Sequence, residues 1–255
     1  MILAIDIGNT NIVIGCIDGK KCLFVERLST VRTKTELEYA FDVKNVLDIY
    51  HIKRTDIEGG IISSVVPQIT TVAKLAVEKI LKKEVLVVGA GIKTGLNIRI
   101  DNPAQLGSDL VVDSVAGSTE YPVPLLIFDM GTANTVCVID KNKNYIGGMI
   151  YPGIGVSLDS LTAHASQLGG ISLEAPEHII GKNTVDCMKS GTIYSAAAAI
   201  DGIIDRLREE VGGEATVIAT GGLAKKIVPY CRRKIILDDN LLLKGLAVIY
   251  RKNRK

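Results

Sequence analysis

The chain has almost no net charge, few histidines and no long apolar run, and each shortage excludes a class of protein. It holds 30 Lys and Arg against 28 Asp and Glu, a formal net charge of +2, which argues against blanket electrostatic binding to nucleic acid. No stretch approaches the roughly 18 apolar residues of a membrane span. The first residues also lack the basic and apolar regions of a secretion signal. We therefore expect a cytoplasmic protein without a membrane partner.

Cysteine and histidine are sparse and scattered, which argues against a disulfide framework or a zinc site. The five cysteines are odd in number and none lies in a CxxC pair, while the three histidines lack ligand spacing. Reduced, packed thiols are the expected state of these cysteines. The glycine motifs GxxxxGK[ST] and GxGxxG are absent too, so any phosphate site must be built in another way.

The length and the order of apolar segments predict an α/β protein with two modest domains. At 255 residues the chain can bury a sizeable core. Short apolar strands alternate with amphipathic segments, which is typical of a sheet covered by helices. The expected helices cover residues 35–50, 68–81, 157–167, 195–211 and 240–251, and the expected strands include residues 21–28, 60–66 and 85–88. Gly147-Gly148 and Pro152-Gly153 are expected to form a flexible connection.

A strand, a polar turn and a second strand open the chain over residues 3–18. The turn reads Asp6-Ile-Gly-Asn-Thr-Asn11. Gly8 can adopt backbone angles that other residues avoid, and its missing side chain lets a ligand approach the main chain. Such a turn can cradle phosphate oxygens, with Asp6 holding Mg²⁺ on them. The alternative is a polar hairpin loop whose Asp caps its own turn, and this motif alone does not decide between the two.

The same motif returns at residues 126–136 with identical spacing, which favours the phosphate interpretation. The matched pairs are Asp6 with Asp129, Gly8 with Gly131, and Asn11 with Asn134. One copy in each half predicts two similar lobes, residues 1–120 and 121–255, that face one nucleotide.

The segment over residues 98–113 predicts a second kind of site. Asp101-Asn-Pro103 is a turn from which Pro can start a helix that continues to about residue 117. Asp109 and Asp113 share a face of that helix, where two like charges are mildly destabilising unless one is solvated or serves a site. Gly107 leaves room beside Asp109. A solvated helix face remains open for Asp113 and is less favoured for Asp109.

A glycine pair follows the strand at residues 216–220. Thr220-Gly221-Gly222 opens a helix, and such a pair lets a flat base or ribose lie against the backbone. An ordinary strand-to-helix turn is the slightly favoured alternative when this pair is taken alone.

The two Asp-x-Gly turns, the Asp-Asn-Pro and Gly-x-Asp segment and the Thr-Gly-Gly strand end occur in an order that resembles the type III pantothenate kinases. The likeness covers essentially the whole chain. It implies an α/β fold of two duplicated ribonuclease-H-like lobes in the actin-like ATPase superfamily. It also implies phosphorylation of pantothenate by ATP, the first step of coenzyme A biosynthesis. A homodimer, Mg²⁺ and a monovalent cation, K⁺ or NH₄⁺, are implied as well.

The resemblance implies roles for individual residues. The ATP-binding residues are Asp6, Ile7, Gly8, Asn9, Thr10, Asn11, Ile12, Val13 and Thr132. The substrate-binding residues are Gly107, Ser108, Asp109, Leu110 and Thr184. Asp109 is the catalytic base for the pantothenate hydroxyl, and Asp129 holds the monovalent cation. That cation would supply positive charge, because neither turn contains Lys or Arg.

Three departures from the family pattern leave the identity of the substrate that accepts the phosphoryl group undecided. Gly107-Ser-Asp-Leu110 replaces the usual Gly-Ala-Asp-Arg, Ile100 replaces a tyrosine, and Gly131-Thr-Ala-Asn-Thr135 replaces Gly-Thr-Ala-Thr-Thr. Loss of the arginine's charged hydrogen bond costs on the order of 1.5–3 kcal/mol, for which Arg99 is a hypothetical substitute. Two alternatives therefore stay open: a kinase of the same fold acting on another small hydroxyl acid, and a non-catalytic nucleotide-binding regulator.

Overall fold

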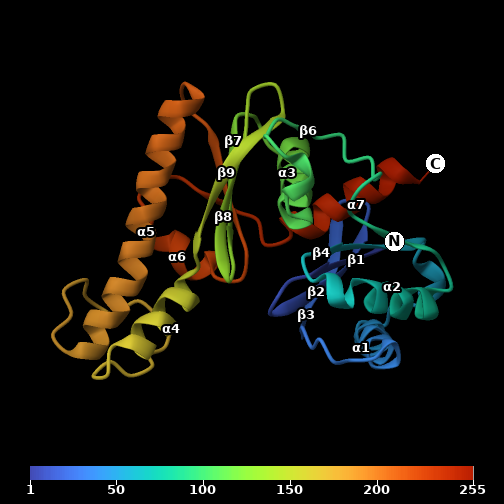
Figure 1. Ribbon diagram of the computed structural model, residues 1–255, viewed down its shortest axis with the longest axis horizontal. Coiled ribbons are helices and arrows are strands. Elements are labelled where there is room, and N and C mark those ends of the chain that lie inside the picture. The colour runs from blue at the N-terminus through green and yellow to red at the C-terminus, as the bar shows by residue number, and fades with distance from the viewer. Residues whose placement is uncertain (255) are drawn as a thin grey trace. The chain divides into compact units, whose positions relative to one another are not determined.

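A computed structural model describes residues 1–254, which form two compact units, each built around one sheet (Figure 1). Unit 1 comprises residues 1–96, 101–119 and 240–254, and unit 2 comprises residues 97–100 and 120–239. The chain changes unit at residue 119, next to the expected boundary. The last helix, which a division at residue 120 assigned to the second lobe, belongs to unit 1.

The two sheets repeat one strand topology. The first has the order β3-β2-β1-β4-β5, and the second has β9-β8-β7-β10-β11 with β6 added beside β9. In each, three consecutive strands pair antiparallel. A fourth strand pairs parallel with the first of these three, and a fifth pairs parallel with the fourth. The first sheet contains β1 (Ile2–Ile7), β2 (Asn11–Asp18), β3 (Lys21–Ser29), β4 (Gly59–Ser64) and β5 (Val85–Val87). The second contains β6 (Asn97–Ile98), β7 (Leu125–Met130), β8 (Ala133–Ile139), β9 (Asn144–Pro152), β10 (Thr216–Thr220) and β11 (Ile236–Leu237). This repetition confirms the duplicated α/β fold.

Local capping explains where several helices begin. Thr35 accepts a hydrogen bond from the Glu38 N–H, and the Glu38 carboxylate accepts one in return, a capping box that starts α1. The α-helices are α1 (Glu36–Ile49), α2 (Pro67–Leu81), α3 (Ser108–Glu120), α4 (Ile154–His164), α5 (Thr184–Val211), α6 (Ala224–Ile227) and α7 (Leu241–Asn253). The short 3₁₀ turns are η1 (Arg54–Asp56), η2 (Pro103–Gln105) and η3 (Val228–Tyr230). No helix within residues 1–254 is long and apolar enough to cross a membrane.

In unit 1, helices cover both faces of the sheet. Leu3, Ile5 and Ile7 alternate along β1 and pack with buried residues of α1 and α2. On the opposite face α7 packs against β1, β2 and β4 (Figure 1). Here the side chains of Leu243 and Tyr250 occupy the space beside Gly15 and Gly59, where any Cβ atom would overlap them. The last helix of the chain therefore completes the core of the first unit.

In unit 2, the long helix α5 supplies much of the core beside the sheet (Figure 1). Phe128 and Met130 of β7 pack in one apolar cluster with Ile193 and Ile200 of α5. This helix begins at Thr184, not at residue 195 where the Ala-rich pattern starts, because the Asn183 side chain accepts a hydrogen bond from the Asp186 N–H.

Two expectations about local structure are wrong. The helix expected from Pro103 to residue 117 is interrupted, since η2 ends before an extended residue, Leu106, and α3 begins anew at Ser108. Gly147-Gly148 is not a flexible connection but part of β9, paired with β8. Gly148 is needed there because a Cβ atom would overlap the Val136 carbonyl.

Candidate functional site

The first acidic turn lies at the end of β1 and is clamped from β3. The Gly8 N–H donates to the Asn11 carbonyl at 3.0 Å. Thr30, which follows β3, donates its hydroxyl to the Gly8 carbonyl at 2.7 Å and its N–H to the Thr10 carbonyl at 3.0 Å. Gly8 does not have the left-handed backbone angles that the sequence allowed it. Its use is space, because a Cβ atom would lie 3.1 Å from the Asn11 carbonyl oxygen.

Arg32 brings a positive charge to this turn, and sequence reasoning missed it. Its Nη2 donates to the Asn9 side-chain oxygen at 3.3 Å. The Asn9 N–H makes no hydrogen bond within residues 1–254, so it is available to an anion beside the guanidinium. Arg32 lies outside the motif and reaches the turn because β2 pairs with β3. The only sequence signal was a basic residue just after the third strand.

The two acidic turns differ by one residue, although their sequences align without a gap. Asp6 pairs with Val13 across the first hairpin, whereas Asp129 pairs with Thr135 across the second. The Gly131 N–H donates to the Ala133 carbonyl at 3.2 Å, so Ala133 takes the structural place that Asn11 has in the first turn. Matching Asn134 to Asn11 was therefore wrong. Asn134 faces the interior, 6% exposed.

Oxygen atoms gather around Asp129 at the end of β7. Thr220 lies beside Asp129 in the parallel register with β10, and Thr135 lies opposite it on β8. The Thr135 hydroxyl oxygen is buried and has no hydrogen-bond partner within residues 1–254. Gly221 has φ +92°, and a Cβ atom there would overlap the Asp129 carboxylate and the Met130 main chain. The Cβ side of Gly221 therefore faces residues of the chain itself, while a base or ribose against the main chain of the glycine pair stays a prediction.

The second turn is held by a hydrogen bond from Gly153, which follows β9. Thr184 lies on another element of unit 2. The Gly153 N–H donates to the Thr132 carbonyl at 3.0 Å, and a Cβ atom on Gly153 would overlap the Gly131 and Thr132 carbonyls. The Thr132 residue itself is exposed. Thr184 is the exposed first residue of α5.

Asp109 stands in the first turn of α3 in an environment that favours its neutral form. Burial raises the pKa of its carboxyl group, and hydrogen bonds from the backbone N–H groups of Leu110 and of Asp109 itself oppose that rise. The Leu110 N–H lies 2.9 Å from Asp109 Oδ1. Gly107 provides the room, because a Cβ atom there would overlap the same oxygen. Asp113, on the same helix, is 1% exposed, so the solvated interpretation of Asp113 is wrong.

Serine side chains join the start of α3 to the end of β4, next to Asp6. Ser63 pairs with Asp6 in the parallel register of β1 and β4. The Ser63 and Ser108 hydroxyl oxygens lie 3.0 Å apart, and Ser108 Oγ also bonds to the Ser64 main chain. The carboxyl ends of β1 and β4 thus carry the acidic turn and, through these serines, Asp109, the candidate base. Leu110 is the residue after that base.

Arg99, the hypothetical substitute for the missing arginine, belongs to unit 2. Its N–H donates to the Tyr145 carbonyl at 2.8 Å, just beyond the pairing of β6 with β9.

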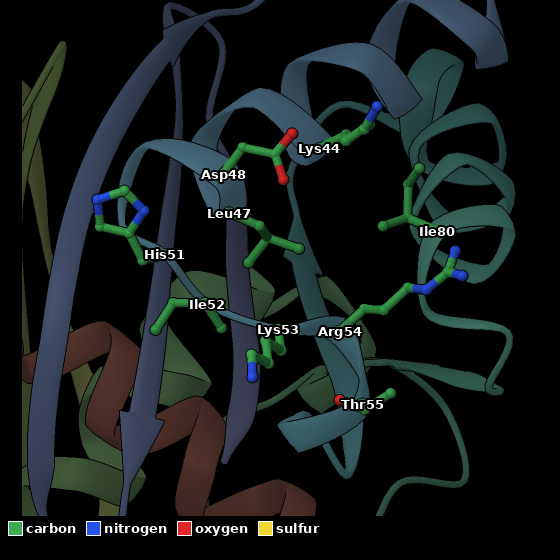
Figure 2. Close-up of a pocket in the computed structure, with 9 residues that line it drawn as sticks. All are labelled: Lys44, Leu47, Asp48, His51, Ile52, Lys53, Arg54, Thr55 and Ile80. Atoms are coloured by element: carbon green, nitrogen blue, oxygen red, sulfur yellow. The ribbon is translucent and has the colours of Figure 1, made fainter.

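A hollow in unit 1 contains none of the predicted site residues. It has a volume of about 740 Å³ and lies among α1, η1 and α2 (Figure 2). Leu47, Ile52 and Ile80 give it apolar lining, and Lys44 and Arg54 line it with charged side chains (Figure 2). The acidic turn and Asp109 lie outside it.

The repeated sheets and their acidic hairpins define the class of protein to which the chain belongs, the actin-like ATPase fold. Component A of the (R)-2-hydroxyglutaryl-CoA dehydratase of Acidaminococcus fermentans matches with a TM-score of 0.58 and 16% identity. That match covers 99% of this chain and 98% of the other, and at such identity it shows the fold alone.

Closer relatives decide the family. The family model of the type III pantothenate kinases matches residues 2–206. The type III pantothenate kinase of Exiguobacterium sp. (strain ATCC BAA-1283 / AT1b) is 46% identical over 255 residues, 100% of both chains. That of Bacillus cytotoxicus is 45% identical over 253 residues, 99% of this chain and 97% of the relative. The chain belongs to the type III pantothenate kinase family, which confirms the resemblance seen in its motifs.

Proposed function

We propose that the protein is a kinase that transfers a phosphoryl group from ATP to the hydroxyl of pantothenate. The product is 4'-phosphopantothenate, at the first step of coenzyme A biosynthesis. The observation that carries the proposal is identity above 40% with type III pantothenate kinases over the full length of the chain. The retained carboxylates Asp6, Asp109 and Asp129 support turnover, because a non-catalytic regulator has little physical need for all three.

Asp109 acts as the base in this proposal. Phosphoryl transfer depends on positioning the attacking hydroxyl in line and on neutralising phosphate charge. A carboxylate whose pKa is raised by burial accepts a proton better than an ordinary aspartate, which suits the pantothenate hydroxyl. The Gly107 position and the Leu110 N–H hold that carboxylate in place.

The nucleotide contacts are proposed at residues 6–13 and at Thr132. In the first turn, the Asn9 N–H and the Arg32 guanidinium offer hydrogen bonds and positive charge to phosphate oxygens. The two hydrogen bonds from Thr30 keep the turn rigid, so the Asn9 N–H needs little rearrangement when phosphate binds.

The residues around both acidic turns fit the cations that the family implies. Asp6 would hold Mg²⁺ through a hard carboxylate oxygen at the end of β1. Asp129 would hold K⁺ or NH₄⁺, and the buried Thr135 hydroxyl without a hydrogen-bond partner offers a further oxygen there. When bound, these cations neutralise phosphate charge. Residues 1–254 contain no cluster of three or more His, Cys, Asp or Glu that could hold a metal ion.

The pantothenate contacts are proposed at Gly107, Ser108, Asp109, Leu110 and Thr184. Leu110 provides an apolar side chain where the family usually has a cation, which favours another hydroxyl acid as a second candidate acceptor. The proposal further includes a cytoplasmic homodimer, with neither membrane nor nucleic acid as a partner.

The test is ADP release from ATP and Mg²⁺ with pantothenate, in K⁺ buffer and again in Na⁺ buffer. Pantothenate-dependent turnover that K⁺ stimulates is expected. ATP binding without turnover would contradict the proposal, and preference for a different acceptor in a panel of small hydroxyl acids would move the assignment to that acceptor.

A further inference from the structure

A group of three serines, here called the serine clamp (Ser63, Ser64 and Ser108), connects two elements that carry the proposed site. Ser63 and Ser64 end β4, and Ser108 begins α3. Ser63 is fully buried. Ser108 Oγ lies 3.0 Å from Ser63 Oγ, 3.0 Å from the Ser64 carbonyl and 3.1 Å from the Ser64 N–H.

These contacts use the whole hydrogen-bonding capacity of the Ser108 hydroxyl. A serine hydroxyl has one proton to donate and two lone pairs that accept. Ser108 donates to the Ser64 carbonyl and accepts from the Ser64 N–H, so its second lone pair accepts from the Ser63 hydroxyl. Nothing remains for a substrate, although the family likeness places Ser108 among the substrate-binding residues.

The clamp also fixes distances across the site. Its buried member, Ser63, is next to Asp6 in the register of β1 and β4, where the phosphate-binding turn begins. Its helical member, Ser108, directly precedes Asp109. A shift of α3 relative to β4 would therefore move the base away from the turn that binds the phosphates.

We infer that Ser108 is a positioning residue, whose hydroxyl holds Asp109 at a set distance from the phosphate-binding turn through β4 and does not contact the substrate, so that the proposed pantothenate contact of Ser108 is made by its main chain. The inference rests on the proposed kinase function. It assigns a role to a serine at a position where the family pattern usually has alanine.

The test compares the kinetics of Ser108→Ala with those of the wild type. Misplacement by about 1 Å can cost up to a hundredfold in rate, so we expect kcat to fall about tenfold. The KM values for ATP and for pantothenate should each change by less than about twofold, because no substrate contact is lost. An increase in the pantothenate KM with unchanged kcat would overturn the inference, and so would wild-type kinetics.

Two further variants separate positioning from general loosening of α3. Ser63→Ala removes one of the three contacts that Ser108→Ala removes, so the double variant should be no slower than Ser108→Ala alone. Ser118→Ala is the matched control, since its hydroxyl bonds within α3 to the Ser114 carbonyl at 2.7 Å, away from the clamp. We expect wild-type kcat for this control, and a loss equal to that of Ser108→Ala would contradict the inference.

Hydrogen exchange tests whether the serine clamp forms, whichever substrate accepts the phosphoryl group. The Ser64 amide should exchange faster in Ser108→Ala than in the wild type, because its acceptor is gone. Unchanged exchange at Ser64 would show that the clamp does not form. A wild type that fails to phosphorylate pantothenate would instead overturn the proposed function and leave the exchange result to be judged by itself.

Discussion

Asp109 shows at the scale of a single residue how catalysis and stability oppose each other. Its pKa is raised by burial, so the folded protein holds the negative charge of this carboxylate less easily than the unfolded chain does in water. The resulting loss of folding stability is complete at pH values above the raised pKa. It shrinks as the pH falls through the raised pKa toward the ordinary value of an aspartate. The same rise means that Asp109, as the proposed base, loses its proton-accepting form at a higher pH than an ordinary aspartate would.

We predict that Asp109→Asn strongly lowers turnover while preserving or raising the melting temperature at neutral pH. General-base catalysis is typically worth 10²–10⁴-fold, so kcat should fall by about that factor. In the wild type, turnover should begin to fall with decreasing pH at a higher pH than an unperturbed aspartate, which titrates near pH 3.9, would give. Full turnover in the variant, or a melting temperature that falls with it, would contradict the assignment.

Arg32 is the second residue on which a prediction rests. Because its guanidinium stands beside Asn9 in the acidic turn, Arg32→Ala should raise the KM for ATP about tenfold, as expected for a lost charge-assisted hydrogen bond of about 1.5 kcal/mol. The KM for pantothenate should hardly change. Arg54→Ala, at an exposed arginine beside the hollow, is the control with the same change of charge. An ATP KM equal in both variants would remove Arg32 from the site.

At the scale of an element, the turn after β10 depends on glycine for two separate reasons. Gly221 has φ +92°, a backbone conformation that side chains disfavour, and Asp129 and Met130 fill the space where a Cβ atom would lie. Neither reason can be read from the motif itself, which slightly favoured an ordinary strand-to-helix turn over a nucleotide contact.

We predict that Gly221→Ala destabilises the protein by about 1–3 kcal/mol, through backbone strain and the displacement of the Asp129 carboxylate. Gly191→Ala is the matched control, because that glycine lies within α5 with open space around its Cβ position. Alanine there should stabilise by about 0.5–1 kcal/mol. Chemical denaturation of both variants measures the change in the free energy of unfolding, which should fall for Gly221→Ala and rise for Gly191→Ala. Equal changes would contradict this account.

At the scale of the whole molecule, the chain returns to its first unit at its end. The apolar residues of α7 are buried against β1, β2 and β4, so unit 1 cannot be complete until the last helix is made. A fragment that ends at the expected lobe boundary, near residue 120, would therefore lack part of its own core.

We predict that Leu243→Ala costs about 2–5 kcal/mol, because this fully buried side chain fills the space beside Gly15. Removal of residues 240–255 should leave unit 1 unfolded and protease-sensitive. Lys44→Ala, on the exposed face of α1, should change stability by no more than about 0.5 kcal/mol. A stable, protease-resistant truncated protein would show that α7 is dispensable.

The sequence by itself determined the class and the family, because both are written in short segments. Alternation of strands and helices, the two acidic hairpins and the capping residues act over a few positions, where hydrogen bonds and hydrophobic period are local. The kinase family and the duplicated α/β fold were accessible for that reason. So were most helix positions, to within a few residues.

Only the tertiary structure decided how those segments meet. The one-residue difference between the hairpins separates Asn134 from Asn11, although both copies have the same spacing. Arg32 reaches its turn through the pairing of β2 with β3, and the serine clamp and the place of α7 bring together segments that are distant in the chain. Such pairing is set by the burial of whole sheet faces, which no short segment of sequence contains.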